Sequence, residues 1–301
     1  MKILVTGACG QLGREIMRQS LNSEHAYIFT DISGSKVDIY GDVFEVRPLD
    51  IADPEDVKQA ISEDIDVIIN CAAYTDVNGA ETDHSKAERI NVTGPAVLAA
   101  AAAAAERQPL LIHISTDYIF DGKANTPYTE EASPAPLNFY GRTKMMGEKA
   151  ILDSGCRYMI FRSSWMYSNF GKNFFLTMDS LTASRAEVNV VFDQTGTPTC
   201  AADLAYLIYY ITEEGMLDRT GIYNYSNEGT CTWYDFAKEI NDLLGHTCRI
   251  IPCRSSEYPS PAARPAYSVL DKKKVRETFG IEIPHWKDSL KLTVQEYYEN
   301  K

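Results

Sequence analysis

The sequence contains no apolar run that approaches the roughly 20 residues of a transmembrane helix, so we expect no membrane span. Its first residues, MKILVTGACG, carry one lysine and a short apolar segment before a glycine-rich turn, which is typical of a β-strand rather than a secretion signal. Basic residues are also in the minority, since 29 Lys and Arg against 42 Asp and Glu give a net charge of −13. This balance argues against nucleic acid or an anionic membrane as a partner, because both need basic patches.

The seven cysteines are odd in number and include no Cys-x-x-Cys pair. This usage predicts reduced thiols and a cytoplasmic location, with neither a disulfide framework nor a zinc site. Asp and Glu form no compact cluster with metal-site character, so the residues themselves predict no metal. A chain of 301 residues without internal repeats or disordered linkers predicts one large domain or two closely packed ones.

The strongest local motif begins the chain. The apolar residues Ile3–Val5 precede GACGQLG, with Gly7, Gly10 and Gly13, and an amphipathic helical pattern follows. A strand, a glycine-rich turn and a helix in this order predict a dinucleotide-binding unit. Glycine lets the backbone approach a pyrophosphate, and the helix N-terminus supplies amides and a positive dipole end. The alternative is a glycine turn in a βα unit that binds nothing.

Acidic residues end the next two predicted strands. Tyr27–Thr30 ends at Asp31, at about the spacing of ~20 residues at which a ribose-binding carboxylate is expected. Asp31 would bind the adenosine hydroxyls of NAD and repel a 2′-phosphate, a repulsion that Lys36 could offset. Leu49–Ile51 is expected to be a third strand, where Asp50 can meet the adenine amino group. The alternative for Asp31 is a structural turn at the end of a strand.

Further along, DVIIN (66–70) predicts a fourth strand and LLIHIS (110–115) a fifth, with an alanine-rich helix over 91–107 between them. The small residues Ala72 and Ala73 would let a flat cofactor lie close, and Tyr74 would border the cleft. Ser115 and Thr116 emerge at the carboxyl end of the fifth strand, where open parallel sheets bind ligands. His113 alternates with isoleucines on that strand and is expected to be a packed side chain rather than a catalyst.

Tyr140 and Lys144 lie four residues apart in LNFYGRTKMMGEK, where Asn138 is the expected N-cap of a helix. This spacing places two side chains on one helix face, about 5–6 Å apart at Cβ. Because an ammonium favours a phenolate, we expect the pKa of Tyr140 to fall from ~10 toward neutral. Such a phenol can give a proton to a developing alkoxide. A solvated helix face is the structural alternative.

After a sixth strand at 157–162, the alternation of strands and helices becomes irregular. Trp165 and Asn173 lie in a loop-rich stretch suited to a sugar and a flat base, although Trp165 could instead be a core anchor. Helices are expected over 203–212 and 232–244, and the proline-rich segment 250–265 is expected to be a loop over the cleft.

The motifs GACGQLG, LDI, NCAAYTDV, STDYIFDG, PLNFYGRTK and FRSSWMY follow one another in a characteristic order. With them the chain resembles the extended short-chain dehydrogenases/reductases, and among these the dTDP-4-dehydrorhamnose reductases, over nearly its whole length. FRSSWMY, GKNFFLTM, DQTGTPT and ARPAYSVL are typical of the narrower group. The expected α/β fold is a Rossmann-type, doubly wound parallel sheet (1–162, NAD(P)-binding) with a smaller C-terminal α/β substrate domain (163–301). A segment near 200–226 is expected to pack back on the first domain.

The resemblance implies catalytic roles for Thr116, Tyr140 and Lys144. Together with the motifs above it gives a set of cofactor-binding residues: Gly7, Gly10, Gln11, Leu12, Gly13, Asp31, Asp50, Ile51, Ala72, Ala73, Tyr74, Tyr140 and Lys144. It also implies a set of substrate-binding residues: Thr116, Asp117, Trp165, Asn173 and Arg264.

The implied reaction is hydride transfer from NAD(P)H to the 4-keto group of dTDP-4-dehydro-6-deoxy-L-mannose, which gives dTDP-L-rhamnose. NADPH is the expected cofactor and NADH the alternative. Mg²⁺ is implied by resemblance alone, with Glu15 as a contributor at a subunit contact of a monomeric or homodimeric protein. Two departures stand out, since Asn78 replaces an expected acid and the loop at 34–47 is long. Another nucleotide-sugar epimerase or dehydratase, or a non-catalytic nucleotide-binding subunit, are the alternatives.

Overall fold

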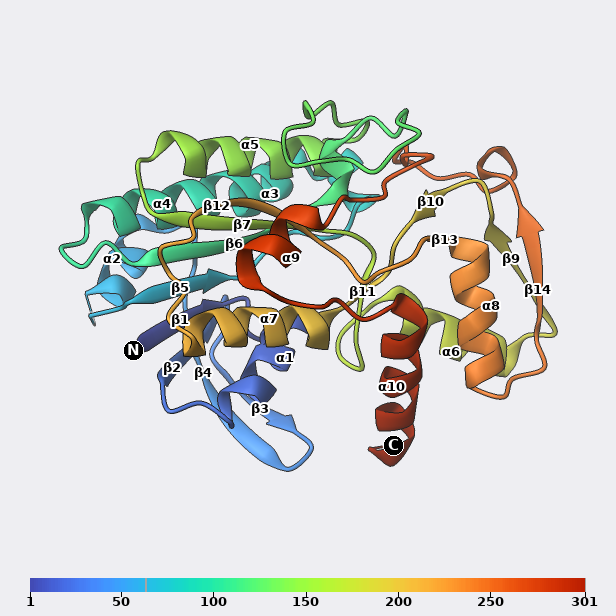
Figure 1. The fold of residues 1–301 in the computed structure, drawn as a ribbon, viewed down its shortest axis with the longest axis horizontal. Coiled ribbons are helices and arrows are strands. Elements are labelled where there is room, and N and C mark those ends of the chain that lie inside the picture. Colours follow the sequence, from blue (N-terminus) through green and yellow to red (C-terminus); the bar gives the residue numbers. More distant parts are fainter. Residues whose placement is uncertain (63, 301) are drawn as a thin grey trace.

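A single eight-stranded sheet organises the computed structural model, which describes residues 1–62 and 64–300 (Figure 1). The strand order is β12-β7-β6-β5-β1-β2-β4-β3, and every described pair is parallel except β3 with β4. The strands are β1 Lys2–Thr6, β2 Ala26–Asp31, β3 Ser35–Ile39, β4 Asp42–Pro48, β5 Val67–Asn70, β6 Leu110–Thr116, β7 Tyr158–Ser163 and β12 Gly221–Tyr225. This topology confirms the predicted Rossmann-type fold.

Helices cover both faces of the sheet (Figure 1). On one face lie α1 (Gln11–Ser20) and α7 (Ala201–Glu213), which pack on each other; on the other lie α2 (Pro54–Ile61), α4 (Gly94–Ala104) and α5 (Phe139–Asp153). The alternation of side chains along a strand explains this division. Ile3 and Val5 belong to the apolar core with α1 and α7, whereas Leu4 belongs to the core with α2 and α4.

The segment expected to be a long loop at 34–47 folds as a hairpin. Strands β3 and β4 pair in antiparallel register around Tyr40 and Gly41, which both have positive φ, 56° and 97°. Val37 and Ile39 point into the core on the α1 side, so the hairpin extends the sheet. The expected strand at Leu49–Ile51 is wrong, because β4 already ends at Pro48 and the chain turns there.

The alanine-rich helix was expected over 91–107, but the helical stretch starts earlier and ends earlier. Helix α3 (His84–Glu88) runs through a π-helical turn, Arg89–Thr93, into α4. Pro95 has no N–H to continue the regular ladder, and the amide of Gly94 bonds to the carbonyl of Arg89 across the wider turn. The helix ends at Ala104, since Ala105 is already extended.

The remaining C-terminal elements form a second, smaller assembly of short strands and helices (Figure 1). Its elements are β8 Met166–Tyr167, α6 Phe174–Ser184, β9 Glu187–Val191, β10 Thr195–Gly196, β11 Thr199–Cys200, β13 Cys231–Thr232, α8 Trp233–Leu243, β14 Arg249–Cys253 and α10 Trp286–Glu299. An apolar core of its own, with Phe175, Phe236 and Trp286, holds α6, α8 and α10 together. The expectation of a loop from residue 250 is wrong at its start, where β14 pairs with β9.

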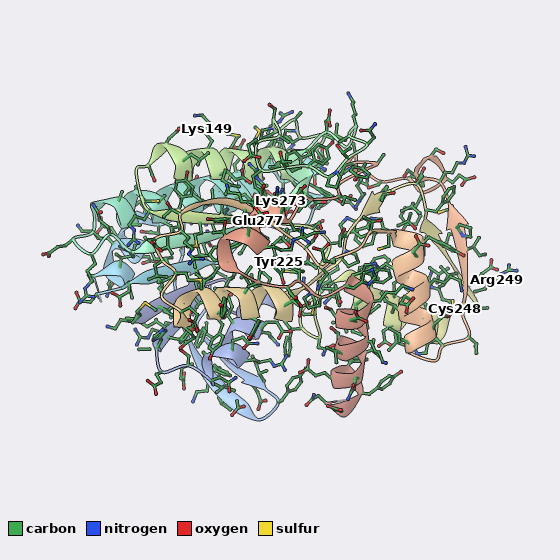
Figure 2. All side chains as sticks on the ribbon, in the orientation of Figure 1. Lys149, Tyr225, Cys248, Arg249, Lys273 and Glu277 are labelled. Carbon is green, nitrogen blue, oxygen red and sulfur yellow. The ribbon has the colours of Figure 1, made fainter. Side chains whose placement is uncertain are left out.

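Three segments of the C-terminal half return to the large sheet. Strand β12 pairs with β7, and α7 packs against α1. Helix α9 (Lys273–Phe279) packs on β12, with Val275 and Phe279 in the core of the large sheet. The predicted domain boundary between residues 162 and 163 therefore does not separate two continuous stretches of chain, and the substrate role of residues 163–301 stays a prediction. Figure 2 shows the labelled Lys149 at the top and Arg249 at the right-hand edge, both on the outside of the molecule, where each forms an exposed ion pair. Within residues 1–62 and 64–300, no helix has the length and apolarity to cross a membrane.

Candidate active site

A cleft of about 480 Å³ opens at the carboxyl ends of β1, β5, β6 and β7, beside the smaller assembly. Open parallel sheets bind ligands at this edge. The cleft is lined by Gly7, Gly10, Gln11, Leu12, Gly13, Cys71, Ala73, Thr75, Val77, Ile114, Ser115, Thr116, Asp117, Tyr118, Tyr140, Lys144, Ser163, Ser164, Trp165, Met166, Gly171, Lys172, Asn173 and Trp233. The structure thus brings together most of the residues singled out by the sequence, from segments far apart in the chain.

The glycine-rich turn forms one wall of this cleft. Gly7 has a φ of +67°, and a Cβ there would lie 2.5 Å from the backbone nitrogen of Ala72. Gly13 allows close packing of α1 on the turn, since a Cβ would lie 2.5 Å from the Cα of Ala8. Gly10 is the N-cap of α1 and has no side chain to fill the cleft, so the first amides of the helix face it. This arrangement fits an anionic pyrophosphate.

Tyr140 and Lys144 lie in the first turns of α5, as expected. Asn138 is its N-cap, and its side-chain oxygen accepts a hydrogen bond of 2.7 Å from the amide of Gly141. Lys144 is 2% exposed, and its Nζ donates to the carbonyl of Ile114 at 2.7 Å.

The expected fall of the Tyr140 pKa is wrong for the protein without ligands. Burial raises the pKa of Tyr140 to about 12, opposed by a hydrogen bond with Thr116. Burial also lowers the pKa of Lys144 to about 8. Lys144 is buried and Tyr140 is half-buried in the wall of the cleft, and the lysine points its Nζ at Ile114 on the neighbouring strand rather than at the phenol.

Thr116 and Asp117 form a buried pair at the end of β6. The Thr116 hydroxyl accepts a hydrogen bond from the amide of Tyr118 and donates to Asp117 Oδ1, both at 3.2 Å. Burial raises the pKa of the Asp117 carboxyl to about 7, against hydrogen bonds from Ser268 and Thr116. Neighbouring Ser115 donates instead to Glu148, which is paired with Arg162 at 2.8 Å. Ser115 is thereby part of an internal polar network, and Thr116 is the hydroxyl that accompanies Tyr140.

Two tryptophans stack on one another in the cleft wall. Trp165 follows β7 with a φ of 46°, a left-handed backbone that is rare for an aromatic residue. Its ring lies 3.7 Å from that of Trp233 between centroids, with 13° between the planes. Sequence reasoning missed Trp233, and also Lys172, which lies beside Asn173. The sequence signal that could have indicated Trp233 is its position as the first residue of a helix, directly after the N-cap Thr232.

Asn173 lines the cleft, but its side-chain amide is already hydrogen-bonded to backbone groups. It caps α6, accepting from the amide of Leu176 at 3.1 Å and donating to the carbonyls of Ser168 and Phe170. Arg264 lies outside the cleft lining and donates to Asn78 Oδ1 at 3.2 Å. One of the partners of Arg264 is therefore Asn78, the residue that stands where an acid was expected.

Other predicted cofactor residues lie outside the cleft lining: Asp31, Asp50, Ile51, Ala72 and Tyr74. Asp31 accepts hydrogen bonds from the amides of Cys9 (3.0 Å) and Ile32 (2.8 Å), so it holds the glycine-rich turn. Asp50 pairs with Arg89, and Ile51 is buried under α4. Their cofactor roles stay predictions.

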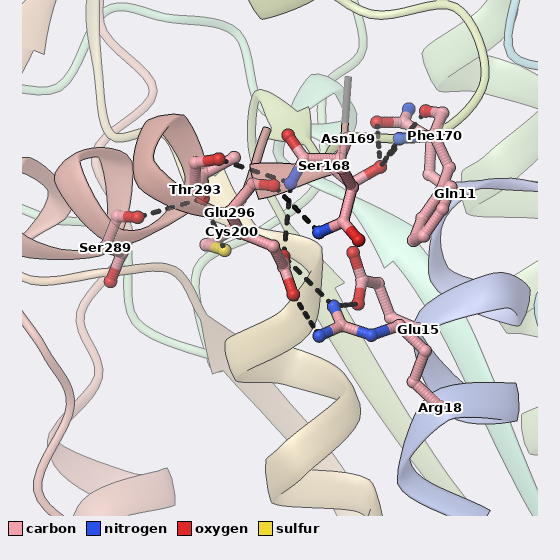
Figure 3. Close-up of polar contacts among 11 residues, drawn as sticks. Gln11, Glu15, Arg18, Ser168, Asn169, Phe170, Cys200, Ser289, Thr293 and Glu296 are labelled. Carbon is pink, nitrogen blue, oxygen red and sulfur yellow. Dashed lines mark hydrogen bonds and ion pairs between the residues drawn. The ribbon is translucent and has the colours of Figure 1, made fainter. Parts of the chain in front are cut away.

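The residues around Glu15 do not fit a magnesium site. Glu15 is 2% exposed, and Arg18 binds it at 2.8 Å and also binds Glu296 of α10 (Figure 3). The guanidinium thus occupies the position between the two carboxylates that a cation would need. Among the described residues, no group of three or more His, Cys, Asp and Glu side chains could hold a metal ion. Mg²⁺ prefers several oxygen ligands in octahedral geometry, and we derive no chemistry from it.

A larger hollow of about 1150 Å³ lies between α2 and α4. Five of its fifteen lining residues are alanines of α4 and the residue after it, and charged side chains such as Lys58 and Arg107 also line it. None of the described lining residues belongs to the glycine-rich turn or to α5, so we assign the chemistry to the smaller cleft, where polar groups converge.

Known proteins resemble the chain over its whole length. Residues 1–299 match the family model described as RmlD substrate binding domain. A dTDP-4-dehydrorhamnose reductase of Burkholderia thailandensis is 36% identical, covering 98% of this chain and 99% of that protein.

Two solved structures extend the comparison. A dTDP-4-dehydrorhamnose reductase of Clostridium acetobutylicum superposes with a TM-score of 0.90 at 39% identity, covering 99% of this chain and 100% of that one. A second, from Bacillus anthracis in complex with NADP, has a TM-score of 0.86 at 33% identity, covering 98% and 99%. The chain therefore belongs to the RmlD substrate binding domain family, and the resemblance inferred from its motifs is confirmed.

Proposed function

We propose that this protein reduces the 4-keto group of dTDP-4-dehydro-6-deoxy-L-mannose to dTDP-L-rhamnose, with NADPH as hydride donor and NADH as a weaker alternative. The observation that carries the proposal is the convergence of Thr116, Tyr140 and Lys144 with the glycine-rich turn in one cleft. The similarity to dTDP-4-dehydrorhamnose reductases at 36% and 39% identity supports the substrate.

A nicotinamide cofactor would supply the hydride when bound. The residues present fit it, because the N-terminus of α1 and Gly10 leave room and free amides for a pyrophosphate. The relative bound to NADP supports the phosphorylated form. Asp31 would read the adenosine ribose from the far side of the turn, and Lys144 would hold the ribose next to the nicotinamide.

Within the cleft, Tyr140 donates the proton that the reduced carbonyl oxygen needs. A pKa of about 12 keeps the phenol protonated at neutral pH, so the proton is present when negative charge develops on the oxygen. The Thr116 hydroxyl, hydrogen-bonded to the same phenol, positions the carbonyl. The phenol stabilises the oxyanion by a hydrogen bond, and the Thr116 hydroxyl does so when its one hydrogen turns from Asp117 to the carbonyl oxygen. Asp117, Trp165, Asn173 and Lys172 line the space left for the sugar and its nucleotide.

The deciding experiment measures NADPH oxidation with the dTDP-linked ketosugar against its UDP- and GDP-linked counterparts. We expect the dTDP sugar to give the highest kcat/KM. Equal rates with all three nucleotides would contradict the dTDP assignment, and turnover with none of them would contradict the reductase. The same preparation, studied by sedimentation at several concentrations, distinguishes the monomer from the homodimer. The cytoplasmic location stays a prediction, consistent with all seven cysteines being free thiols.

A further inference from the structure

A line of buried polar side chains crosses three neighbouring strands behind Lys144. Thr6 on β1 stands in register with Asn70 on β5, and Asn70 stands in register with His113 on β6. All three are at most 1% exposed, and Lys144 is 2% exposed. A row of polar groups in the middle of an apolar sheet is costly unless each hydrogen bond is made.

The hydrogen bonds of this line connect to the catalytic lysine. The Thr6 hydroxyl donates to Asn70 Oδ1 at 2.8 Å, and Asn70 Nδ2 lies 3.0 Å from His113 Nδ1. On the other side of the imidazole, His113 Nε2 lies 3.3 Å from Lys144 Nζ.

The direction of each bond follows from one unambiguous donor. The backbone amide of Ala72 lies 3.1 Å from Asn70 Oδ1 and can only donate, so that atom is the amide oxygen. Asn70 therefore turns its NH₂ group to His113, whose Nδ1 must accept. A neutral imidazole carries one hydrogen, which is then on Nε2 and faces Lys144. Burial lowers the pKa of His113 well below its ordinary value, which supports the neutral ring.

We propose that His113 is a positioning residue of the active site: fixed by Asn70 as the Nε2–H tautomer, it donates a hydrogen bond to Lys144 whenever that amine is uncharged. The amine in turn donates to the carbonyl of Ile114 at 2.7 Å. Each group in the line then has a consistent donor and acceptor. This role rests on the proposed function of Lys144, and it replaces the expectation that His113 merely packs.

The consequence concerns the charge of the lysine. An ammonium has no lone pair and can only donate. When Lys144 is protonated, its N–H and the Nε2–H of His113 are two donors that repel each other, so this hydrogen bond is lost. Other groups around the lysine act too: the Cys71 thiol lies nearby, Glu148 on the same helix favours the ammonium, and Tyr140 is one turn away. Burial lowers the pKa of Lys144 to about 8, so the ammonium predominates below about pH 8, and the uncharged amine that can accept from His113 predominates above it. His113 thus helps to decide when the lysine is charged.

The tautomer can be read directly in the protein without substrate. In ¹⁵N-labelled protein, two-bond ¹H–¹⁵N correlations distinguish protonated from unprotonated ring nitrogens, and the chain has only five histidines. The signal missing from His113→Gln identifies the ring. We expect a protonated Nε2 and a bare Nδ1 throughout the neutral range. A hydrogen on Nδ1, or an imidazolium, overturns the proposal.

A second measurement follows the lysine itself through its ¹³Cε shift, assigned with Lys144→Met. Asn70→Asp turns the donor into an acceptor, which moves the imidazole hydrogen to Nδ1 and lets the ammonium donate to Nε2. We expect the Lys144 titration to move upward by about one pH unit or more. Thr6→Val is the matched control, since it removes a buried hydrogen bond of Asn70 but leaves the NH₂ group facing His113. It should leave the titration where the wild type has it.

Asn70→Asp also adds a negative charge, which could raise the pKa of Lys144 without any change of tautomer. Removing the imidazole distinguishes this charge effect from the tautomer effect. In a His113→Phe background the same substitution can act through charge alone, so its shift should be clearly smaller. An equal shift with and without the imidazole overturns the proposal. If Asn70→Asp does not fold, the tautomer measurement on the wild type still decides. Because neither measurement uses the ketosugar, a failed substrate assignment and a failed role for His113 are distinguishable.

Discussion

At the scale of single residues, a phenol with a pKa of about 12 holds its proton at any physiological pH. Tyr140 is for this reason suited to donate a proton, which is the direction a ketone reduction needs. After the donation the phenolate is buried, and a nearby cation becomes valuable. Lys144 meets that need when it is protonated and leaves His113.

Removal of this proton donor gives the first prediction. Tyr140→Phe should keep the fold and cofactor binding while lowering kcat by about 10²-fold or more, the usual size of a general acid–base contribution. Steady-state NADPH oxidation measures it. Tyr223→Phe is the control, because it removes a remote phenol that donates to the carbonyl of Arg219 at 2.8 Å. Turnover of Tyr140→Phe within threefold of the parent would refute the assignment.

Asp31 offers a prediction about cofactor preference. Its carboxylate is held by the amides of Cys9 and Ile32, and its proposed role puts it near the 2′-phosphate of NADPH. Two charges about 4 Å apart interact by roughly 1–4 kcal/mol near a protein surface, so Asp31→Ala should raise kcat/KM for NADPH relative to NADH by about tenfold.

The control for this prediction is Lys36→Ala. Lys36 is exposed and paired with Glu45 at 2.9 Å, so its loss should shift the preference slightly toward NADH. Kinetics with both cofactors check the two variants side by side. An unchanged ratio in Asp31→Ala would mean that this residue only holds the turn.

At the scale of elements, the sequence predicted best where a local signal had one structural meaning. Asn138 caps α5 as expected, because a side-chain oxygen before a helical pattern satisfies its first amides. The β3–β4 hairpin was missed, since its two strands are short and mostly exposed and their pairing was hidden in a long polar stretch. The π-helical turn at Arg89–Thr93 has no periodic signature in a sequence.

The contact between α1 and α10 carries a prediction about pH and stability. Burial raises the pKa of Glu15 from 4.5 to about 7, although Arg18 opposes the shift. The folded protein therefore favours the protonated carboxyl. The stability this provides is fully present below pH ~4.5, the pKa of the unfolded chain, and is lost as the pH rises through about 7.

Glu15→Gln imitates the protonated group at every pH. Relative to the wild type it should gain on the order of 1–3 kcal/mol in free energy of unfolding between pH 5 and pH 8. Urea unfolding at the two pH values measures the gain. The exposed Glu214→Gln should differ from the wild type by less than about 0.5 kcal/mol at both. A variant that loses stability relative to the wild type as the pH rises would show that the pair with Arg18 dominates.

At the scale of the whole molecule, the cleft is made by parts that no local pattern connects. Thr116 could be predicted because the carboxyl edge of a parallel sheet gathers its strand ends, and Tyr140 because it lies four residues before Lys144 on one helix face. Trp233 could not, because its position depends on how the smaller assembly lies against that edge. The direction of the Tyr140 pKa shift was missed for the same reason, since burial is a property of the assembled protein.

The stacked tryptophans join the two sides of the cleft. Trp165 follows β7 of the large sheet and Trp233 begins α8 of the smaller assembly, with their ring centroids 3.7 Å apart. An aromatic pair contributes about 0.5–1.5 kcal/mol beyond the effect of its buried area. Loss of one ring should therefore reduce the free energy that holds the other ring in place by about that amount. Both rings line the space proposed for the nucleotide sugar.

We therefore expect Trp233→Ala to raise KM for the dTDP-linked ketosugar by about 3- to 10-fold, the kinetic equivalent of that free energy. The affinity for NADPH should hardly change, because the glycine-rich turn lies on the other wall. Lys238→Ala on the same helix is the control. The Lys238 ammonium lies 3.7 Å from the Asp242 carboxylate, and neither residue lines the cleft. Calorimetric titration with NADPH and steady-state kinetics with the sugar separate the two ligands. If Trp233→Ala weakens NADPH binding and leaves KM for the sugar unchanged, the tryptophans belong to the cofactor side and the proposed division of the cleft is wrong.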